Sequence, residues 1–153
     1  MKKTIIALAM LTAAATTAKA AEVTINGAWS STDNTQYSLG IAAGQSIMAF
    51  GNIGIGVEGA LDYTKKRDVR NQTEVFANGV ISYDLGTFSP YILAGPGYRW
   101  SDLKGNQSRY NIGAGTKIRL TDMMNLDVRY RRIDNFKNNR PEDKITVGIG
   151  FKF

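Results

Sequence analysis

Val147-Gly148-Ile149-Gly150-Phe151-Lys152-Phe153 closes the sequence and shows the pattern that decides the fold. Large apolar residues stand at every second position, and small or charged residues stand between them. Successive side chains of a β-strand point to opposite faces, so this segment predicts a strand with one apolar face and one small or polar face. The fold then depends on which face the rest of the chain turns inward.

The same alternation of period two recurs along the chain. It has a clear phase in five further segments: 23–30, 37–44, 53–63, 110–120 and 126–131. Segment 74–84 has an unclear phase. Segment 91–100 is interrupted by Pro96, where we expect a bulge or distortion because proline lacks a ladder N–H. Eight strands at even spacing predict an all-β fold, a closed antiparallel up-and-down barrel.

The composition of the two faces predicts the surroundings of this barrel. An eight-stranded barrel has a narrow interior, which suits glycine and paired charges but not large residues. Gly-x-Gly pairs recur at 54/56, 95/97, 113/115 and 148/150, and we expect them to face the lumen. The large apolar residues then face outward, as in a transmembrane barrel surrounded by lipid. The alternative, a soluble lipocalin-like barrel, would place the bulky residues inside.

The first twenty residues predict a cleaved signal peptide. Lys2 and Lys3 precede an apolar run, and Ala18 and Ala20 supply the small-x-small pattern of a cleavage site. The run is too short for a membrane anchor. We therefore expect 1–20 to be the signal and 21–153 the barrel. Removal of 20 of the 153 residues leaves 133 and takes away three lysines, so the net charge falls from +6 to +3.

The residue types that are missing narrow the chemistry. The sequence has no cysteine, so no disulfide contributes to its stability. It also has no histidine, which removes a Ser-His-Asp triad and the usual zinc ligands. Gly54-Ile55-Gly56-Val57-Glu58-Gly59 matches a dinucleotide fingerprint, but that motif requires a helix after it and the strand alternation continues to Tyr63. We expect no cofactor, no metal and no catalytic residues.

The connections between strands fall into two sets. One set is polar and charged, and we expect it outside the cell: Ser31–Gln36, Lys65–Gln72, Ser101–Ser108 and Asn135–Asp143. The other set is shorter or more turn-like, and we expect it in the periplasm: Gln45–Phe50, Leu85–Ser89 and Thr121–Asn125. Aromatic residues predict a belt at each rim, with Trp29 and Trp100 at the outer one and Phe88, Tyr91 and Phe153 at the inner one.

Several of these segments resemble a known group of proteins. The Tyr83-Asp84 strand end, the Pro90-Tyr91 strand start followed by Gly95-Pro96-Gly97-Tyr98, and the Leu120-Thr121-Asp122 turn are similar to the small outer-membrane barrels of the opacity-protein and OmpA-like (OmpX/Ail-type) group. The resemblance covers the whole mature chain. It implies a monomer in the outer membrane of a Gram-negative bacterium. Members range from adhesins to membrane-stabilising proteins, and the loops here are short for an opacity-type adhesin.

The last segment also resembles the carboxy-terminal signal that the barrel-assembly machinery reads. Thr146 and Gly148 stand at its polar and glycine positions, and Phe151 and Phe153 stand at its two aromatic positions. An exposed strand edge can be captured by strand addition, with side-chain pockets that fix the register. The resemblance therefore implies this machinery as a partner.

Charged residues on the small-residue face predict a network inside the barrel. Its members are Glu58, Asp62, Asp84, Arg99, Lys117, Arg119, Asp127, Arg129 and Lys152, with Arg131 as a further candidate. Buried charges must be paired, and acidic and basic groups are both present. We interpret the set as a salt-bridged interior that fills the barrel. A small ion path or a catalytic carboxylate pair is the alternative reading.

Basic residues crowd the loops that we expect outside the cell. The candidate polyanion contacts are Lys65, Lys66, Arg67, Arg70, Arg132, Lys137 and Arg140. Lys104 and Arg109 flank the third loop, and Asp134, Glu142 and Asp143 temper the fourth. Such a rim suits lipopolysaccharide phosphates or sulfated host glycans. The alternative is ordinary solubilising charge.

The sequence thus predicts a non-catalytic outer-membrane barrel for envelope integrity or adhesin-like surface interaction. Its expected partners are outer-membrane lipid and lipopolysaccharide, with a host-surface glycan or protein as an alternative partner. Nucleic acid is not expected, because the protein is predicted to be exported. A narrow or gated porin-like channel is the second hypothesis.

Overall fold

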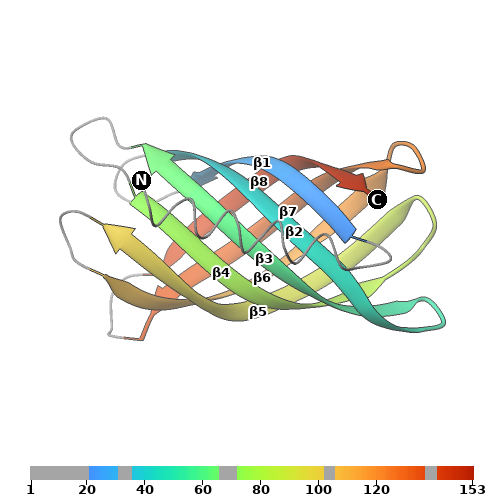
Figure 1. The fold of residues 1–153 in the computed structure, drawn as a ribbon, viewed down its shortest axis with the longest axis horizontal. Coiled ribbons are helices and arrows are strands. Elements are labelled where there is room, and N and C mark those ends of the chain that lie inside the picture. The colour runs from blue at the N-terminus through green and yellow to red at the C-terminus, as the bar shows by residue number, and fades with distance from the viewer. Residues whose placement is uncertain (1–20, 31–35, 66–71, 102–105, 137–140) are drawn as a thin grey trace.

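The computed structural model describes residues 21–30, 36–65, 72–101, 106–136 and 141–153. These residues form eight strands, and each strand pairs antiparallel with its neighbours in one closed barrel (Figure 1). The strands are β1 (Ala21–Ser30), β2 (Gln36–Phe50), β3 (Ile53–Lys65), β4 (Gln72–Tyr83), β5 (Phe88–Ser101), β6 (Gln107–Arg119), β7 (Met124–Asn135) and β8 (Glu142–Lys152). The predicted fold is confirmed. No helix in the described ranges is long and apolar enough to cross a membrane.

The two ends of the barrel differ in their connections. At one end, called the turn end below, three short connections join β2 to β3, β4 to β5 and β6 to β7. Gly51 and Gly86 have positive φ angles of 59° and 88°, which L side chains rarely adopt. At the opposite end, called the loop end, the strands flank the ranges 31–35, 66–71, 102–105 and 137–140, which lie outside the described residues.

The strands are strongly tilted against the barrel axis. One row of paired residues begins at Ala21, at the turn end of β1, and reaches Asp143, at the loop end of β8. Between them the row runs through Gln45, Val57, Gly79, Ala94, Ile112 and Arg132. Tilt of this kind is what closing a sheet into a barrel requires. It brings side chains from distant strands to one level of the lumen.

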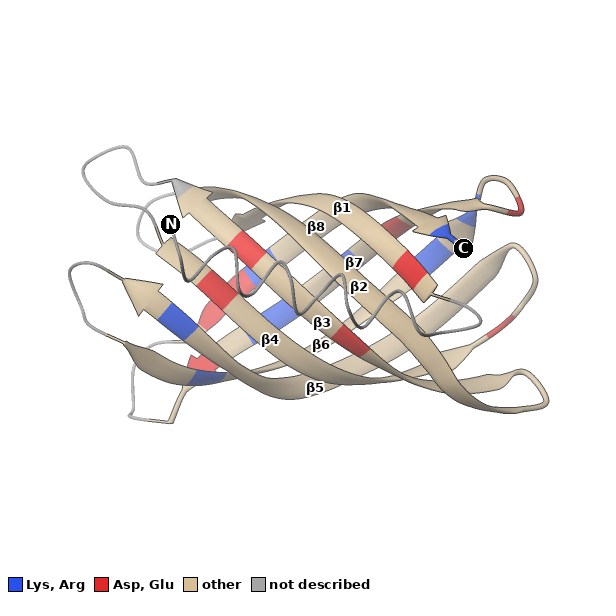
Figure 2. Ribbon diagram, viewed as in Figure 1, with Lys and Arg blue, Asp and Glu red and all other residues tan. Residues whose placement is uncertain are grey.

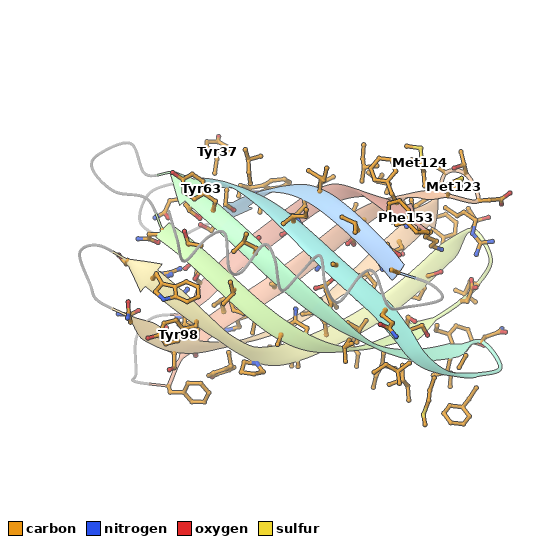
Figure 3. All side chains as sticks on the ribbon, in the orientation of Figure 1. Tyr37, Tyr63, Tyr98, Met123, Met124 and Phe153 are labelled. Atoms are coloured by element: carbon orange, nitrogen blue, oxygen red, sulfur yellow. The ribbon has the colours of Figure 1, made fainter. Side chains whose placement is uncertain are left out.

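The outer face of the barrel is apolar. Ile25, Leu39, Ile92 and Ile112 are between 58% and 71% exposed, although they lie within strands. Such an exposed band has no stable place in water, and lipid is the solvent that it fits. Figure 3 shows side chains projecting outward all along the barrel. The prediction that the large residues face outward is confirmed.

The inner face is built from small and polar residues. A Cβ atom added to Gly113 would lie 2.5 Å from the carbonyl oxygen of Tyr130, and one added to Gly115 would lie 2.6 Å from the hydroxyl of Tyr91. Gly148 is equally restricted, with the carbonyl oxygen of Ile25 at 2.7 Å. At these positions glycine gives the space that larger lumen side chains occupy.

The structure settles the phase of β4, which the sequence left unclear. Glu74, Phe76 and Asn78 are buried and point inward, whereas Ala77 and Gly79 are exposed on the outer face. The pattern was ambiguous because this strand turns a large aromatic ring inward and small residues toward lipid.

Two irregularities interrupt the ladders. The pairing of β4 with β5 lapses between the Phe76–Gly97 and Gly79–Ala94 pairs, opposite Pro96, with no change of register. Pro96 therefore produces the expected local distortion but no bulge. A bulge lies instead in β2, between Ser46 and Met48. The predicted turn Gln45–Phe50 is wrong. Those residues continue the strand, and the turn is at Gly51 and Asn52.

Aromatic residues mark both ends of the outer face. Tyr37, Tyr63 and Tyr98 lie near the loop end, whereas Phe153 lies at the turn end with Met123 and Met124 (Figure 3). Amphipathic tyrosine rings suit the boundary between hydrocarbon and head groups. The predicted member Tyr91 differs, because its side chain is only 4% exposed and lies in the lumen.

Candidate functional site: the charged lumen and the turn-end vestibule

The loop-end half of the lumen contains a dense ion-pair network, and Figure 2 shows the acidic and basic positions on neighbouring strands. Asp62 on β3 stands at its centre and is 1% exposed. Its Oδ2 accepts hydrogen bonds from Arg131 Nη2 at 2.7 Å and Lys144 Nζ at 2.9 Å. These partners come from β7 and β8, so the network joins opposite walls of the barrel.

A second set of pairs lies beside this centre, nearer the loop end. Glu74 Oε1 accepts hydrogen bonds from Arg99 Nε at 2.6 Å and Arg109 Nη1 at 2.7 Å. Glu142 Oε2 is bonded to the same two arginines, at 2.6 Å and 3.2 Å. Each guanidinium therefore bridges two carboxylates. With Asp62, Arg131 and Lys144, this half of the lumen contains three acidic and four basic groups.

The middle of the lumen holds a smaller charged layer. Arg129 Nη1 donates to Glu58 Oε1 at 2.8 Å, and the same guanidinium is ion-paired with Asp127. The hydroxyl of Tyr91 donates to Asp127 Oδ1 at 2.6 Å, and the amide of Asn78 donates to Glu58 Oε1 at 3.1 Å. This layer contains two acidic groups and one basic group.

The charges of the lumen balance over its whole length. A further pair, Lys117 with Glu22 at 2.8 Å, lies toward the turn end. The three groups of pairs together hold six acidic and six basic side chains in the described lumen. An isolated buried charge costs several kcal/mol, so this balance is what allows so many charges inside a membrane protein.

Apolar side chains fill the space between these layers. Leu93, Ile133 and Phe76 are buried at 2%, 0% and 4% exposure. The guanidinium of Arg131 lies 5.7 Å from the centre of the Phe76 ring. In the described residues the lumen is therefore a packed plug at these levels and not a continuous channel.

Below the plug, a vestibule of about 390 Å³ opens at the turn end. Its inner limit is formed by Glu58 and Tyr91, and Glu22 and Lys117 line its wall. Seven of the seventeen remaining lining residues are glycine or serine, with Gly54, Gly56, Ser82 and Ser89 among them. The missing side-chain volume at these positions creates the space.

The structure places the predicted lumen residues in two groups. Glu58, Asp62, Arg99, Lys117, Asp127 and Arg129 lie inside the barrel in ion pairs. Asp84, Arg119 and Lys152 lie at the turn end and are exposed rather than buried, and Asp84 and Lys152 line the vestibule. Asp84 lies beyond the end of β4, and its carboxylate is 3.6 Å from Arg119.

Of the predicted polyanion contacts, five lie outside the described residues: Lys66, Arg67, Arg70, Lys137 and Arg140. Lys65 ends β3. Arg132 lies on β7 rather than in a loop, with its side chain exposed on the outer face. Its register partners are Ile112 and Asp143, and Tyr130 on the same face donates a 2.6 Å hydrogen bond to Asp143.

Four members of the loop-end network were not among the predicted lumen residues. Arg109 and Glu142, expected at the loops, are network members, and so is Lys144, which the sequence reasoning did not consider. Continuing the alternation backward from Thr146 would have placed Lys144 and Glu142 inside. Glu74 could not be found in this way, because the phase of its strand was ambiguous.

The four positions of the predicted assembly signal occupy both faces of β8 and the residue after it. Thr146 and Gly148 are buried and face the lumen, whereas Phe151 and Phe153 are exposed. In the closed barrel β8 pairs with both β1 and β7, so it is not a free edge. Any strand addition at this segment therefore precedes closure, and recognition by the assembly machinery stays a prediction.

The chain has measurable similarity to solved barrels. The N-terminal β-barrel domain of Pseudomonas aeruginosa OprF is 21% identical, with a TM-score of 0.67 over 89% of this chain and 98% of that one. Ail of Yersinia pestis is 12% identical, with a TM-score of 0.64 over 89% and 99%. A second Ail structure, in complex with the heparin analogue sucrose octasulfate, is 15% identical, with a TM-score of 0.56 over 88% and 98%.

An enzyme shares this fold as well. The outer membrane enzyme PagL is 14% identical, with a TM-score of 0.58 over 84% of this chain and 98% of that one. Identities at this level show the fold alone, and the fold hosts both binding proteins and enzymes.

No curated protein sequence is significantly similar to the chain. A family model described as "Outer membrane protein beta-barrel domain" matches residues 4–153. The match covers the closed barrel, its apolar outer face and its charged lumen, which places the protein in the cell outer membrane. The chain belongs to the outer membrane protein beta-barrel domain family.

Proposed function

We propose that this protein is a non-catalytic barrel that supports the outer membrane and contacts polyanions at the cell surface. The observation that carries this proposal is the plugged lumen. In the described residues the charges inside the barrel are committed to one another, at distances of 2.6–3.2 Å in the loop-end network. The loop-end half of the interior is therefore a scaffold, and the outer surface carries the function proposed here.

The loop end is the face that we assign to the cell exterior, since short turns of such barrels lie in the periplasm. Lys65, Lys66, Arg67 and Arg70 follow one another closely where β3 ends. Guanidinium and ammonium groups form strong charge-assisted hydrogen bonds with phosphate and sulfate. The proposed ligands are lipopolysaccharide and, alternatively, a sulfated host glycan. The Ail complex with a heparin analogue supports sulfate as a ligand class for this fold.

Arg132 adds a contact of a different kind. Its side chain is exposed on the outer face of β7 and lies between the levels of Tyr130 and Asp134. Tyrosine side chains favour the head-group region, and Tyr130 on the same face therefore supports a depth for Arg132 near the lipid phosphates. We propose that it binds the phosphate of a neighbouring lipopolysaccharide molecule, with the barrel as a monomer.

The test is binding of the refolded barrel to lipopolysaccharide and to heparin over a salt series. The variant R67A/R70A removes two positive charges at the loop end, and R119A/K152A removes two at the turn end. We expect binding to weaken with salt. It should also weaken roughly 5- to 30-fold in R67A/R70A but not in R119A/K152A, because about 1–2 kcal/mol of screened attraction is lost at the loop end. Equal affinity of both variants would leave the loop charge with a solubilising role only.

A narrow or gated channel is the second candidate, and the vestibule favours it because it already opens part of the lumen. The plug above it predicts that the wild type is silent in planar lipid bilayers. Stable conductance steps that depend on the lumen charges would support the channel and contradict the scaffold.

A further inference from the structure

The vestibule is closed by a layer of buried charge that does not balance itself. Glu58 and Asp127 carry two negative charges, and Arg129 between them carries one positive charge. All three are at most 8% exposed. The inner limit of the vestibule therefore has an excess of one negative charge, held where water screens it poorly.

Glu58 presents part of its carboxylate to this space. Both hydrogen bonds that reach it, from Asn78 and from Arg129, end on Oε1. Among the described residues no hydrogen bond reaches Oε2, although the side chain is nine-tenths buried and lines the vestibule. Oε2 is accessible from the vestibule rather than sealed in the wall, and among the donors that could reach it a charged group forms the strongest hydrogen bond.

The other charges that face the vestibule are paired or peripheral. Lys117 is bound to Glu22 at 2.8 Å, and Arg119 lies 3.6 Å from Asp84 at the rim. Lys152 remains: it lines the mouth of the vestibule and is exposed. A cation that enters would be attracted by the inner layer and repelled by Lys152.

We propose that the vestibule binds small organic cations that carry a primary ammonium group. The ammonium donates to Glu58 Oε2, and the aliphatic part of the ligand lies against Tyr91 and the glycine-rich wall. The volume of about 390 Å³ is at the lower end of the range for small-molecule sites. Access is from the turn end, so the ligand is a periplasmic solute. This proposal is independent of polyanion binding at the loop end.

The experiment titrates the full barrel, refolded in a non-ionic detergent, with 1,4-diaminobutane and with the uncharged analogue 1,4-butanediol. Nuclear magnetic resonance follows the backbone amides of Gly54, Gly56 and Ser82, which line the vestibule. We expect saturable shifts at these amides with the diamine only.

Three variants test the assignment. E58Q keeps an acceptor for Asn78 and Arg129 but removes the charge, and should weaken binding about tenfold or more. K152A removes the repelling cation, and should strengthen binding several-fold. E142Q, an identical substitution in the loop-end network, should leave the affinity unchanged.

Opposite effects of E58Q and K152A support the site. If E58Q fails to fold, K152A and K152E test the proposed site in its place, because Lys152 is exposed and its substitution should not prevent folding. Both variants should raise the affinity for the diamine, K152E more strongly than K152A. Equal shifts with the diol, or an affinity that K152A does not raise, would overturn the proposal.

Discussion

Replacing Arg129 with methionine should destabilise the barrel more than any other single loss of a lumen cation. The guanidinium is 2% exposed and joins Glu58 and Asp127, so its removal leaves two carboxylates buried beside each other. Methionine is similar in length and fills the same space. The variant R129M therefore isolates the loss of charge from the loss of volume.

The magnitude follows from the burial of the partners. Removing one member of a buried ion pair costs about 3–5 kcal/mol, because the other member stays in the interior without compensation. The matched control is K117M, whose ammonium is 28% exposed and has one partner, Glu22. Solvent screens that pair, so its loss should cost about 1 kcal/mol or less. The triple variant E58Q/D127N/R129M removes the whole charge cluster and should recover most of the stability that R129M loses.

The assay is reversible urea unfolding of the barrel in lipid vesicles, followed by the fluorescence of Trp29 and Trp100. Equal slopes of the transitions will show that the variants expose the same surface on unfolding, so that their midpoints can be compared. The interpretation fails if R129M and K117M cost the same free energy. It also fails if the triple variant is as unstable as R129M, since packing rather than uncompensated charge would then explain the loss.

Three further predictions follow from the packing, the assembly signal and the aromatic belt. Gly95→Ala should cost about 1–3 kcal/mol, because the new Cβ would overlap the carbonyl oxygen of Ala77, whereas Gly27→Ala, with open space around it, should be nearly neutral in the same urea assay. Deletion of Phe153 should lower the amount of barrel in the outer membrane of cells without slowing refolding in vitro, and equal losses in both would contradict a targeting role. In single-tryptophan variants, Trp29 should be quenched more strongly by lipids brominated near the head group than by lipids brominated near the chain end, and the reverse order would contradict its place near the loop end.

The strand faces could be read from the sequence because lipid imposes them. Ile25 and Leu39 lie outside and Asn26 and Gly40 lie inside, as the period of two predicts. The reading was uncertain where one residue broke the rule. On β4 the aromatic ring of Phe76 points inward. On β5 the ring of Tyr91 also points inward, and its hydroxyl donates a hydrogen bond to Asp127. Neither inward orientation can be predicted from the alternation alone.

The pairing inside the lumen could not be predicted for a different reason. Asp62 meets Arg131 and Lys144, which are 69 and 82 positions away in the sequence. Strand tilt and register decide which inward residues share a level, and the alternation of one strand carries no information on either. The sequence therefore predicts the type of interior and not the identity of the pairs.

In this barrel most apolar residues lie on the outer face and the polar residues fill the interior, the reverse of a soluble protein. The barrel's cluster of buried apolar residues is small, consisting of Ala42, Ala60, Phe76 and Ile133 in the described part of the chain. The apolar area that would form the core of a soluble protein faces lipid instead, and a change of one methyl group there is accommodated by a fluid solvent. The interior is held by ion pairs and by glycines at contact distance, which tolerate neither an added Cβ nor a lost charge. Substitutions should therefore be tolerated on the outer face and destabilising in the lumen. This includes the glycines of the vestibule wall, since a Cβ added to Gly56 would lie 2.5 Å from the carbonyl oxygen of Gln45.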